Sequence, residues 1–286
     1  MSKLSAKVGQ GNSELNTEKR VSKVKQETSS LTKMLRVLEL FSAEAPVWYA
    51  IDIIKALNTS RSTGYRYVKA LNAAGLLSAV GNGYYVLGPR IIELDHQIRQ
   101  TDPLLQAGRG VIEQLVEATD HSALLSMLFQ NSVLCIDQQL APLSPPQILS
   151  RGQSRPLTRG AISRVILAHL PNHRLRVIYS RRHTEIAEMK LGNTWVEFRD
   201  RMAMIRSDGF ARSIGEFNPG IIGIAAPVFN REHSIIGSVS IAFREEELPH
   251  LNINRTILTV KRAAHEITRR ISQMAPELSL PPRAVG

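Results

Sequence analysis

The segment Arg61-Ser62-Thr63-Gly64-Tyr65-Arg66 begins a stretch, from about Ser60 to Ala74, in which apolar and polar residues separate at helical spacing. One face is apolar: Gly64, Tyr67, Val68, Leu71 and Ala74. The opposite face is polar and basic: Arg61, Ser62, Tyr65, Arg66, Lys69 and Asn72. Arginine pairs well with guanine, asparagine with adenine, and hydroxyl or ammonium groups with phosphate. We therefore predict a helix that packs through one face and offers the other to the major groove of DNA.

The residues on either side of this helix predict its partners. Apolar residues recur at helical spacing from Leu31 and predict an amphipathic helix that ends near Ala45-Pro46, and a second short helix is predicted over residues 50–57. A tight polar break follows at residues 58–60, with Thr59 as the expected N-cap. After Gly75, strand-like runs at 76–80 and 84–87 are joined by Gly81-Asn82-Gly83, which is a hairpin signal. Three helices followed by a hairpin are typical of a winged helix-turn-helix.

The charge of this region supports contact with DNA. Between Asp52 and Glu93 the sequence contains no Asp or Glu, although several Lys and Arg residues fall there, whereas a merely solvated surface usually mixes both signs. Residues near the start of a recognition helix lie closest to the base edges, so Arg61, Ser62, Tyr65 and Arg66 are expected in the groove. The full set of predicted DNA contacts is Lys55, Thr59, Ser60, Arg61, Ser62, Thr63, Tyr65, Arg66, Lys69 and Asn82.

The composition of the whole chain fits a regulator of this kind. Its 286 residues allow about two domains, and 43% hydrophobic residues allow real cores. A net charge of +11 favours a polyanionic partner, with a charge that only aids solubility as the alternative. The single cysteine, Cys135, excludes an internal disulfide and lies in an apolar run, so it is expected to be a small buried hydrophobe. With no signal peptide and no apolar run of about 18 residues, we expect a cytoplasmic protein without a membrane partner.

The chain is predicted to have five parts. Residues 1–29 are expected to be a disordered leader, 30–89 the winged helix-turn-helix, 90–102 a linker helix, 103–275 a second domain and 276–286 a flexible tail. In the second domain, an amphipathic helix over about 104–116 precedes strands at 123–129 and 133–136 and helices at 161–169 and 195–208. Strands at 224–229 and 235–243 flank a hairpin turn, and a long helix over 254–274 closes the domain. This mixture predicts an α+β fold around an antiparallel sheet.

In this order and spacing, the motifs resemble the IclR family of bacterial transcriptional regulators. They are residues 61–66, Gly75-Leu76-Leu77, residues 85–90, Pro156-Leu157, Asp208-Gly209-Phe210, and Gly220 followed by residues 224–229. The resemblance runs from about Leu31 to Met274. It implies a winged helix-turn-helix, a linker helix and a GAF/profilin-like effector-binding domain. It also implies homodimers, often paired into tetramers, on palindromic operators, and a two-fold dimer would multiply the specificity of one short helix.

The resemblance also implies the position of an effector pocket. Its lining would include Ala161, Ile162, Gly223, Ser240 and Ala242, with Glu216 near it. The chain has Ser163-Arg164 where the family commonly has Gly-Lys, Gly223 where it often has cysteine, and Ala242 where it often has serine. These departures predict a roomier and less polar pocket than one built for a very small acid such as glyoxylate.

Four arginines crowd the segment that would rim this pocket: Arg151, Arg155, Arg159 and Arg164. Because a guanidinium binds carboxylate well, Arg155 and Arg159 are predicted to hold a carboxylic or aromatic acid, with exposed arginines on a solvated loop as the alternative.

Enzyme functions find little support in the sequence. His169 and His173 have a spacing that could serve a metal, but Pro171 lies between them and no third ligand is near, so they are expected to be surface histidines. Glu216 alone is weak support for acid–base chemistry. We expect no enzymatic activity, no metal and no cofactor. The alternative of another class is an architectural DNA-binding protein whose second domain only oligomerises.

Overall fold

The computed structural model describes residues 29–144 and 149–274. The chain divides into two compact units, Met1–His96 and Gln97–Gly286, and each is described by itself. The division falls inside the predicted linker helix. The predicted tail, and the predicted leader apart from Ser29, lie outside the described residues. No described helix is both long and apolar enough to cross a membrane.

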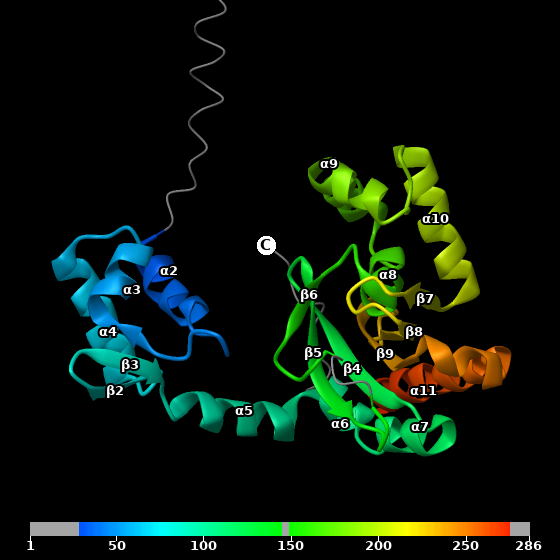
Figure 1. Cartoon of the computed structure of the whole chain (residues 1–286), viewed down its shortest axis with the longest axis horizontal. Helices are drawn as coiled ribbons and strands as arrows, with labels where there is room; N and C mark the ends of the chain where they lie inside the picture. Colours follow the sequence, from blue (N-terminus) through cyan, green and yellow to red (C-terminus); the bar gives the residue numbers. More distant parts are fainter. Residues whose placement is uncertain (1–28, 145–148, 275–286) are drawn as a thin grey trace, which may run out of the picture. The chain divides into compact units, whose positions relative to one another are not determined.

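The first unit is a winged helix-turn-helix (Figure 1). Its helices are α2 (Ser30–Leu35), the 3-10 helix η1 (Arg36–Leu40), α3 (Ala50–Ala56) and α4 (Arg61–Ala73). Its strands are β1 (Trp48–Tyr49), β2 (Leu77–Gly81) and β3 (Tyr84–Leu87), which form an antiparallel sheet in the order β1-β3-β2. The predicted turn Gly81-Asn82-Gly83 joins β2 to β3, with positive φ at all three residues.

The core of this unit follows the apolar face predicted for α4. Tyr67, Val68 and Leu71 are buried against Val37 and Ile53 from the preceding helices. Gly64 is required where α4 crosses α3, because a Cβ at this position would lie 2.4 Å from Cγ1 of Ile54. The close crossing fixes α4 and leaves its other face outside the core.

Three local predictions in the first unit are wrong. The first helix ends at Leu40 rather than near Ala45, because its second half tightens into 3-10 geometry. Ser60, not Thr59, is the N-cap of α4, since its Oγ accepts from the backbone N–H of Thr63. The two-residue strand β1 was not predicted, because only its pairing with distant β3 makes it a strand.

Helix α5 (Arg90–Thr101), the predicted linker helix, spans the boundary between the two units. Within the described residues, the second unit contains six further helices and one 3-10 helix. These are α6 (Pro103–Gly108), α7 (Val111–Thr119), α8 (Gly160–Ala168), α9 (Asn172–Glu188), α10 (Trp195–Asp208), η2 (Glu245–His250) and α11 (Ile253–Gln273). Its strands are β4 (Ser122–Phe129), β5 (Ser132–Gln139), β6 (Ser154–Pro156), β7 (Ala211–Ile214), β8 (Ile221–Phe229) and β9 (Ile235–Arg244). All neighbouring strands pair antiparallel in the order β6-β5-β4-β9-β8-β7.

Helices cover both faces of this sheet, as the α+β prediction requires (Figure 1). Alternate residues of the long strands point to opposite faces. On one face, Leu125, Val239 and Ile241 pack against α6, α7 and α11. On the other face, Val133 and Ala225 pack under α8 and its neighbours α9 and α10. The sheet is therefore the middle layer of a three-layer unit.

The predicted helix over 104–116 is two helices. It breaks at Arg109-Gly110, where Gly110 takes a positive φ of 77°. Helix α9 was not predicted, because its outward side is crowded with basic residues that mask the buried Leu175 and Ile178. Strands β6 and β7, at the two edges of the sheet, are only three and four residues long and were not predicted either.

Candidate DNA interface and effector pocket

The start of α4 is held by a small group of hydroxyls. The Oγ of Ser60 accepts from the backbone N–H of Thr63 at 3.4 Å and lies 3.0 Å from the Thr63 hydroxyl. The cap satisfies one of the free N–H groups of the first turn, and the remaining ones give this end a partial positive charge. Anions such as DNA phosphates are favoured at such a helix end.

The outer face of α4 is exposed and positively charged. Arg61, Ser62, Tyr65, Arg66 and Lys69 are all exposed. In the described part of the chain, none of the three cations forms an ion pair, so their charges are free for an external anion. The structure therefore brings the central part of the predicted DNA-binding set onto one surface.

The wing lies beside this helix and carries Asn82 at its tip. Asn82 is exposed and has a positive φ of 49°. The ring of Tyr49 packs so closely against Gly83 that an added Cβ would lie 2.5 Å from it. The Tyr49 ring also packs against that of Tyr84, with centroids 5.1 Å apart and the ring planes tilted by 49°. The tip that presents Asn82 is thus fixed by an aromatic pair.

Lys55, from the predicted DNA-binding set, and Asn72, from the polar face of α4, each have a partner within the protein. Lys55 is paired with Asp52 at 3.0 Å, although both side chains remain exposed. The Oδ1 of Asn72 accepts from the backbone N–H of Ala79 at 3.2 Å. This bond joins α4 to the wing and occupies the amide oxygen of Asn72, while its suitability for adenine stays a prediction.

One cavity in the second unit collects every residue predicted for the effector pocket. It lies between the start of α8, the part of the sheet formed by the inner strands β8 and β9, and the loop after β7. The predicted residues in its lining are Arg155, Arg159, Ala161, Ile162, Glu216, Gly223, Ser240 and Ala242. That they bind an effector remains a prediction, but the structure places them around one space.

Arg155 is the cation of this cavity. Its guanidinium carbon lies 3.9 Å from the centre of the Phe217 ring. Burial lowers its pKa, which is the sign of a charge removed from water without full compensation. Among the described residues no carboxylate pairs with Arg155. An anion entering the cavity would supply the missing partner.

The other predicted arginines have different surroundings. Arg164 forms an ion pair with Glu216 at 2.8 Å, with each side chain only 15% exposed, and also donates to the carbonyl of Met189. Arg159 is 37% exposed and lies 3.8 Å from Glu185. Arg151 is not among the lining residues. The expected crowd of four arginines at the rim is therefore wrong, because only Arg155 and Arg159 face the cavity.

Glu216 is in the lining but is committed to the protein. One carboxylate oxygen accepts from the backbone N–H of Gly160 at 2.8 Å, at the first residue of α8, while the other pairs with Arg164. Its charge is thus neutralised, and its geometry fixes the end of α8 at the cavity. Glu216 shapes the site rather than repelling an anion from it.

The floor of the cavity is apolar with a few hydroxyls. Leu124, Leu149 and Ala242 belong to one apolar cluster beneath it. The hydroxyls of Ser163 and Ser240 are buried and have no hydrogen-bond partner within the described structure. An unpaired buried hydroxyl is costly, so these two groups favour a polar ligand or ordered water.

The free volume of this cavity is about 60 Å³. An apolar cavity that holds benzene measures about 150 Å³, so the free space in this conformation is smaller than a benzene site. That the pocket is roomier than one built for a very small acid stays a prediction. Gly223 keeps the space open, since an added Cβ would lie 3.0 Å from the Ser213 hydroxyl and 3.5 Å from the Ala161 Cβ.

Sequence reasoning missed several residues of the lining. Ser213 belongs to the unpredicted strand β7, and Phe217 to the loop that follows it. Leu124 could have been found from the alternation of β4, because even-numbered residues there face α8. The remaining missed residues are Leu149, Gly160, Ser163, Asn218, Ile221 and Ile241.

The other residues considered for chemistry have structural roles. Cys135 is fully buried, and burial raises the pKa of its thiol to about 12, so it is an unreactive small hydrophobe as predicted. His173 is exposed, but His169 is half-buried, with Nδ1 2.8 Å from the Val165 carbonyl, so its prediction as a surface histidine is wrong. Over residues 29–144 and 149–274 no group of three metal-ligating side chains occurs.

The fold and these sites match a known family. Residues 96–269 match the family model described as the bacterial transcriptional regulator IclR C-terminal domain, and residues 30–81 match the IclR helix-turn-helix domain. The first match alone covers more than half of the chain. The chain belongs to the IclR family. It is accordingly a DNA-binding regulator of transcription with an effector-binding domain.

Curated relatives and solved structures agree with the IclR assignment. The chain is 24% identical to the HTH-type transcriptional regulator KipR of Bacillus subtilis, over 87% of this chain and 99% of the relative. It is 25% identical to XynR of Escherichia coli, over 74% and 85%.

In structure, the chain matches an IclR transcriptional regulator from Alicyclobacillus acidocaldarius with a TM-score of 0.71 at 22% identity, over 85% of this chain and 98% of that one. An IclR homologue from Microbacterium hydrocarbonoxydans, complexed with 4-hydroxybenzoate, gives 0.69 at 20% identity, over 86% and 100%.

Proposed function

We propose that this IclR-family protein binds a palindromic operator through α4 and the wing, and that a small organic acid in the cavity beside α8 changes its affinity for that operator. The genes it controls would be those that degrade the acid or its precursor. Within the cell it would work in the cytoplasm, with no membrane partner. Its direct role would be regulation, not catalysis, in keeping with relatives that are transcriptional regulators.

The observation that carries the effector proposal is the environment of Arg155. It is a partly buried cation, stacked on Phe217, with no carboxylate from the described residues in reach. A carboxylate would pair with its guanidinium and restore the interactions lost on burial. Ser163 and Ser240 would donate or accept at the other side of such a ligand. The homologue complexed with 4-hydroxybenzoate supports an acid as the ligand class.

The size of the acid follows from the volume of the cavity. At about 60 Å³ the space suits an acid of a few heavy atoms. An aromatic acid would require the stacked Arg155 and Phe217 to move apart. Phe217 lies between Gly215 and Gly220, both with positive φ, in the loop that would have to shift. Short aliphatic acids and hydroxybenzoates are therefore both to be tested.

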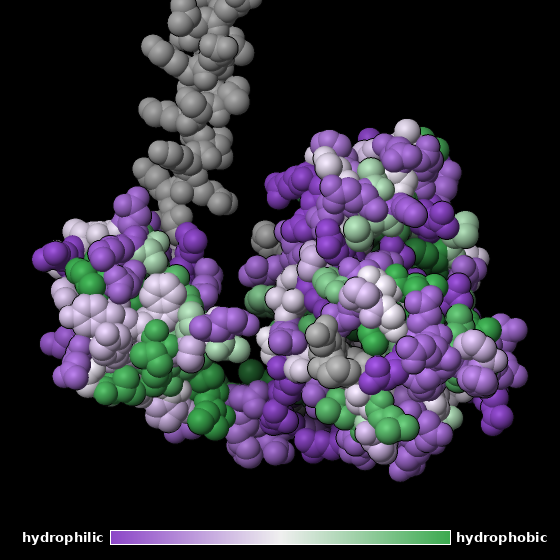
Figure 2. Space-filling model, in the orientation of Figure 1, coloured by the Kyte–Doolittle hydropathy of each residue, from purple (hydrophilic) through white to green (hydrophobic). Residues whose placement is uncertain are grey.

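The linker helix supports a dimer. Helix α5 has no buried residue, and Ile91, Leu94 and Ile98 recur on it at the spacing of a helical stripe. Hydrophobic side chains are exposed on the first unit (Figure 2), and within the stripe Ile98 is 50% exposed while Ile91 and Leu94 are half-buried. A second copy of α5 packed along this stripe would bury it and place two recognition helices on one operator. The same dimers could pair into tetramers.

The effector is tested by thermal unfolding of the full-length protein against a panel of carboxylic acids, from acetate to 4-hydroxybenzoate, with uncharged amides of the same acids as controls. A ligand that binds only the folded protein raises Tm by mass action. We expect one group of acids to raise Tm and their amides to have no effect. The gain should disappear in Arg155→Ala and persist in Arg174→Ala, an arginine outside the cavity.

A gain in Tm that survives Arg155→Ala would show that the acid binds elsewhere and would overturn the carboxylate site. A broad panel of acids and neutral metabolites with no effect on Tm would favour the architectural alternative, in which the second unit only oligomerises.

A further inference from the structure

Helix α6 is too short to be stable alone, so the contacts at its two ends define its position. It has six residues, whereas isolated helices need about 12–15 to persist in water. At its start, the Asp102 carboxylate accepts from the backbone N–H groups of Leu104 and Leu105, both at 3.0 Å. Its side chains are almost all buried in the core of the second unit.

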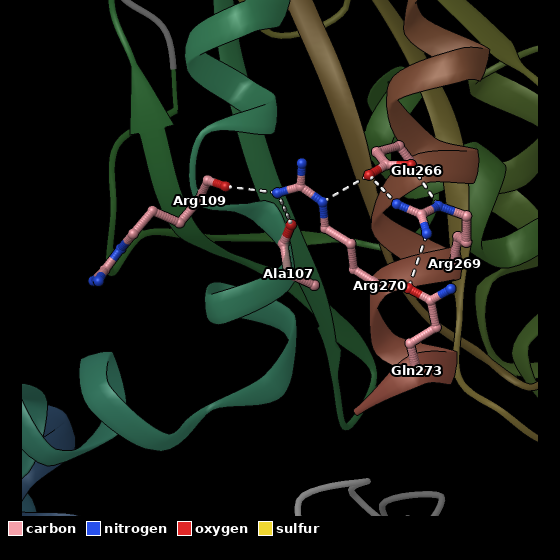
Figure 3. Close-up of polar contacts among 6 residues, drawn as sticks. All are labelled: Ala107, Arg109, Glu266, Arg269, Arg270 and Gln273. Atoms are coloured by element: carbon pink, nitrogen blue, oxygen red, sulfur yellow. Dashed lines mark hydrogen bonds and ion pairs between the residues drawn. The ribbon is translucent and has the colours of Figure 1, made fainter. Parts of the chain in front are cut away.

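At its end, α6 is held by an arginine from a remote part of the sequence. The Nη1 of Arg270, on α11, donates to the carbonyl of Arg109 at 3.1 Å and lies 3.4 Å from that of Ala107 (Figure 3). These carbonyls are the ones a helix end leaves without internal partners. A cation here also opposes the negative end of the helix dipole.

The arginine is itself oriented by a carboxylate one turn earlier on α11. The Nε of Arg270 donates to Glu266 at 2.8 Å, and Arg269 donates to both oxygens of the same carboxylate (Figure 3). Hydrogen bonds from Arg269 and Arg270 lower the pKa of Glu266 to about 2, so it stays charged at neutral pH. Arg269 also donates to Gln273 Oε1, and within the described residues it forms no hydrogen bond to α6, so only Arg270 joins α11 to the end of α6.

Helix α6 connects the last turn of α5 to the strands that line the cavity. The Nε2 of Gln106 donates to the Arg99 carbonyl at 2.7 Å, and this hydrogen bond joins α6 to the last turn of α5. On its other side α6 touches β4 and β9: a Cβ at Gly108 would lie 2.4 Å from Leu125, and one at Gly237 would lie 3.0 Å from Leu104. The next residue of β4, Leu124, lines the cavity, as does Ser240 of β9.

We propose that Arg270 is a positioning residue that locks α6 between the sheet and the last turn of α5, so that residues 97–101 are held in one orientation on the second unit. Without this bond the joint at residues 101–110 would absorb a small shift of β4 or β9. With it, the shift reaches the end of α5. The wider role, passing a change in the cavity towards DNA, rests on the proposed function.

Hydrogen–deuterium exchange of the full-length protein tests the lock without an effector or an operator. In Arg270→Gln we expect amides in residues 99–110 to exchange about tenfold faster, because a hydrogen bond from a charged group is lost. Strands β8 and β9 should be unchanged, and Arg269→Gln, the matched control, should match wild type. Equal acceleration in both variants, or acceleration spread over β8 and β9, would overturn the proposal.

A second variant covers the case in which Arg270→Gln does not fold. Gln106→Leu removes the bond to Arg99 and keeps the size of the side chain, so only residues 97–102 should exchange faster while α6 stays protected. Unchanged exchange at 97–102 would contradict the lock. Binding of wild type and all variants to a mixed-sequence DNA duplex provides a separate check. If the wild-type protein itself did not bind the duplex, the DNA-binding proposal would be contradicted, whereas the lock would not.

Discussion

Arginine has three different roles in the second unit, and they depend on which acids lie in reach. Arg164 is neutralised by Glu216, Arg270 is oriented by Glu266, and Arg155 has a ring but no acid among the described residues. The first two therefore hold the structure together. Arg155 retains unsatisfied charge at a cavity, which is the arrangement expected of a ligand-binding residue.

The outer residues of α4 should separate into base and phosphate contacts. Arg61→Ala or Arg66→Ala should cost about 1–3 kcal/mol on a selected operator and relax its sequence preference, because an arginine that pairs with a base is lost. Lys69→Ala should weaken all duplexes alike and reduce the salt dependence by about one counterion. Fluorescence anisotropy on selected and scrambled duplexes over a range of salt checks this. If Arg66→Ala weakened binding to both duplexes equally, Arg66 would contact phosphate rather than a base.

His121, which is buried, and His169, which is half-buried, should make the second unit less stable in mild acid. Burial lowers the pKa of His121 despite nearby Glu247, and burial likewise lowers the pKa of His169. In mild acid the unfolded chain therefore binds protons at these histidines more readily than the folded protein does. The free energy of unfolding is highest above about pH 6.5, the pKa in the unfolded chain, and decreases as the pH falls from there towards the lower pKa of the folded state. Tm should fall between about pH 7.5 and 5.5, and fall less in His121→Gln or His169→Gln. An equal fall in wild type and both variants would contradict this assignment.

At the scale of elements, glycine sets how closely α4 approaches α3. A Cβ at Gly64 would lie 2.4 Å from Ile54, so Gly64→Ala should destabilise the first unit by about 1–3 kcal/mol through overpacking. Lys69→Ala on the exposed side should change stability by no more than about 0.5 kcal/mol. Urea unfolding in a Trp195→Phe background, where Trp48 alone reports on the first unit, measures both. A loss of less than about 0.5 kcal/mol for Gly64→Ala would mean that α3 yields easily.

Elements with strong local signals could be predicted from the sequence. The two faces of α4 and the turn Gly81-Asn82-Gly83 define the DNA-binding unit through neighbours only a few residues apart. Strands β1 and β7 could not be predicted in this way, because they are two and four residues long and depend on pairing with β3 and β8.

The cavity was predictable in its residues but not in its chemistry. Eight of its lining residues were predicted, six from the family resemblance and two, Arg155 and Arg159, from the run of arginines, and all eight meet in one place. The pairing of Arg164 with Glu216, which lie 52 positions apart, required the fold, and so did the small volume of about 60 Å³. Distance in sequence hides which charges neutralise each other.

At the scale of the whole molecule, the cavity and the recognition helix lie in different units, joined by α5. An effector can act on DNA binding only if it binds the two arrangements of the dimer with different affinity. The direction of the response, repression or release, depends on where the operator lies relative to the promoter. The coupling itself is a property of the protein and can be measured in solution.

The most direct test measures the affinity of the full-length protein for a selected operator by fluorescence anisotropy, with and without the acid that raises Tm most. We predict that the acid changes the wild-type Kd between about 5- and 150-fold, the usual range of allosteric coupling. Arg155→Ala should bind the operator as tightly as wild type, and the acid should leave its Kd unchanged. A wild-type Kd that no stabilising acid changes, or an Arg155→Ala variant that responds like wild type, would contradict the account.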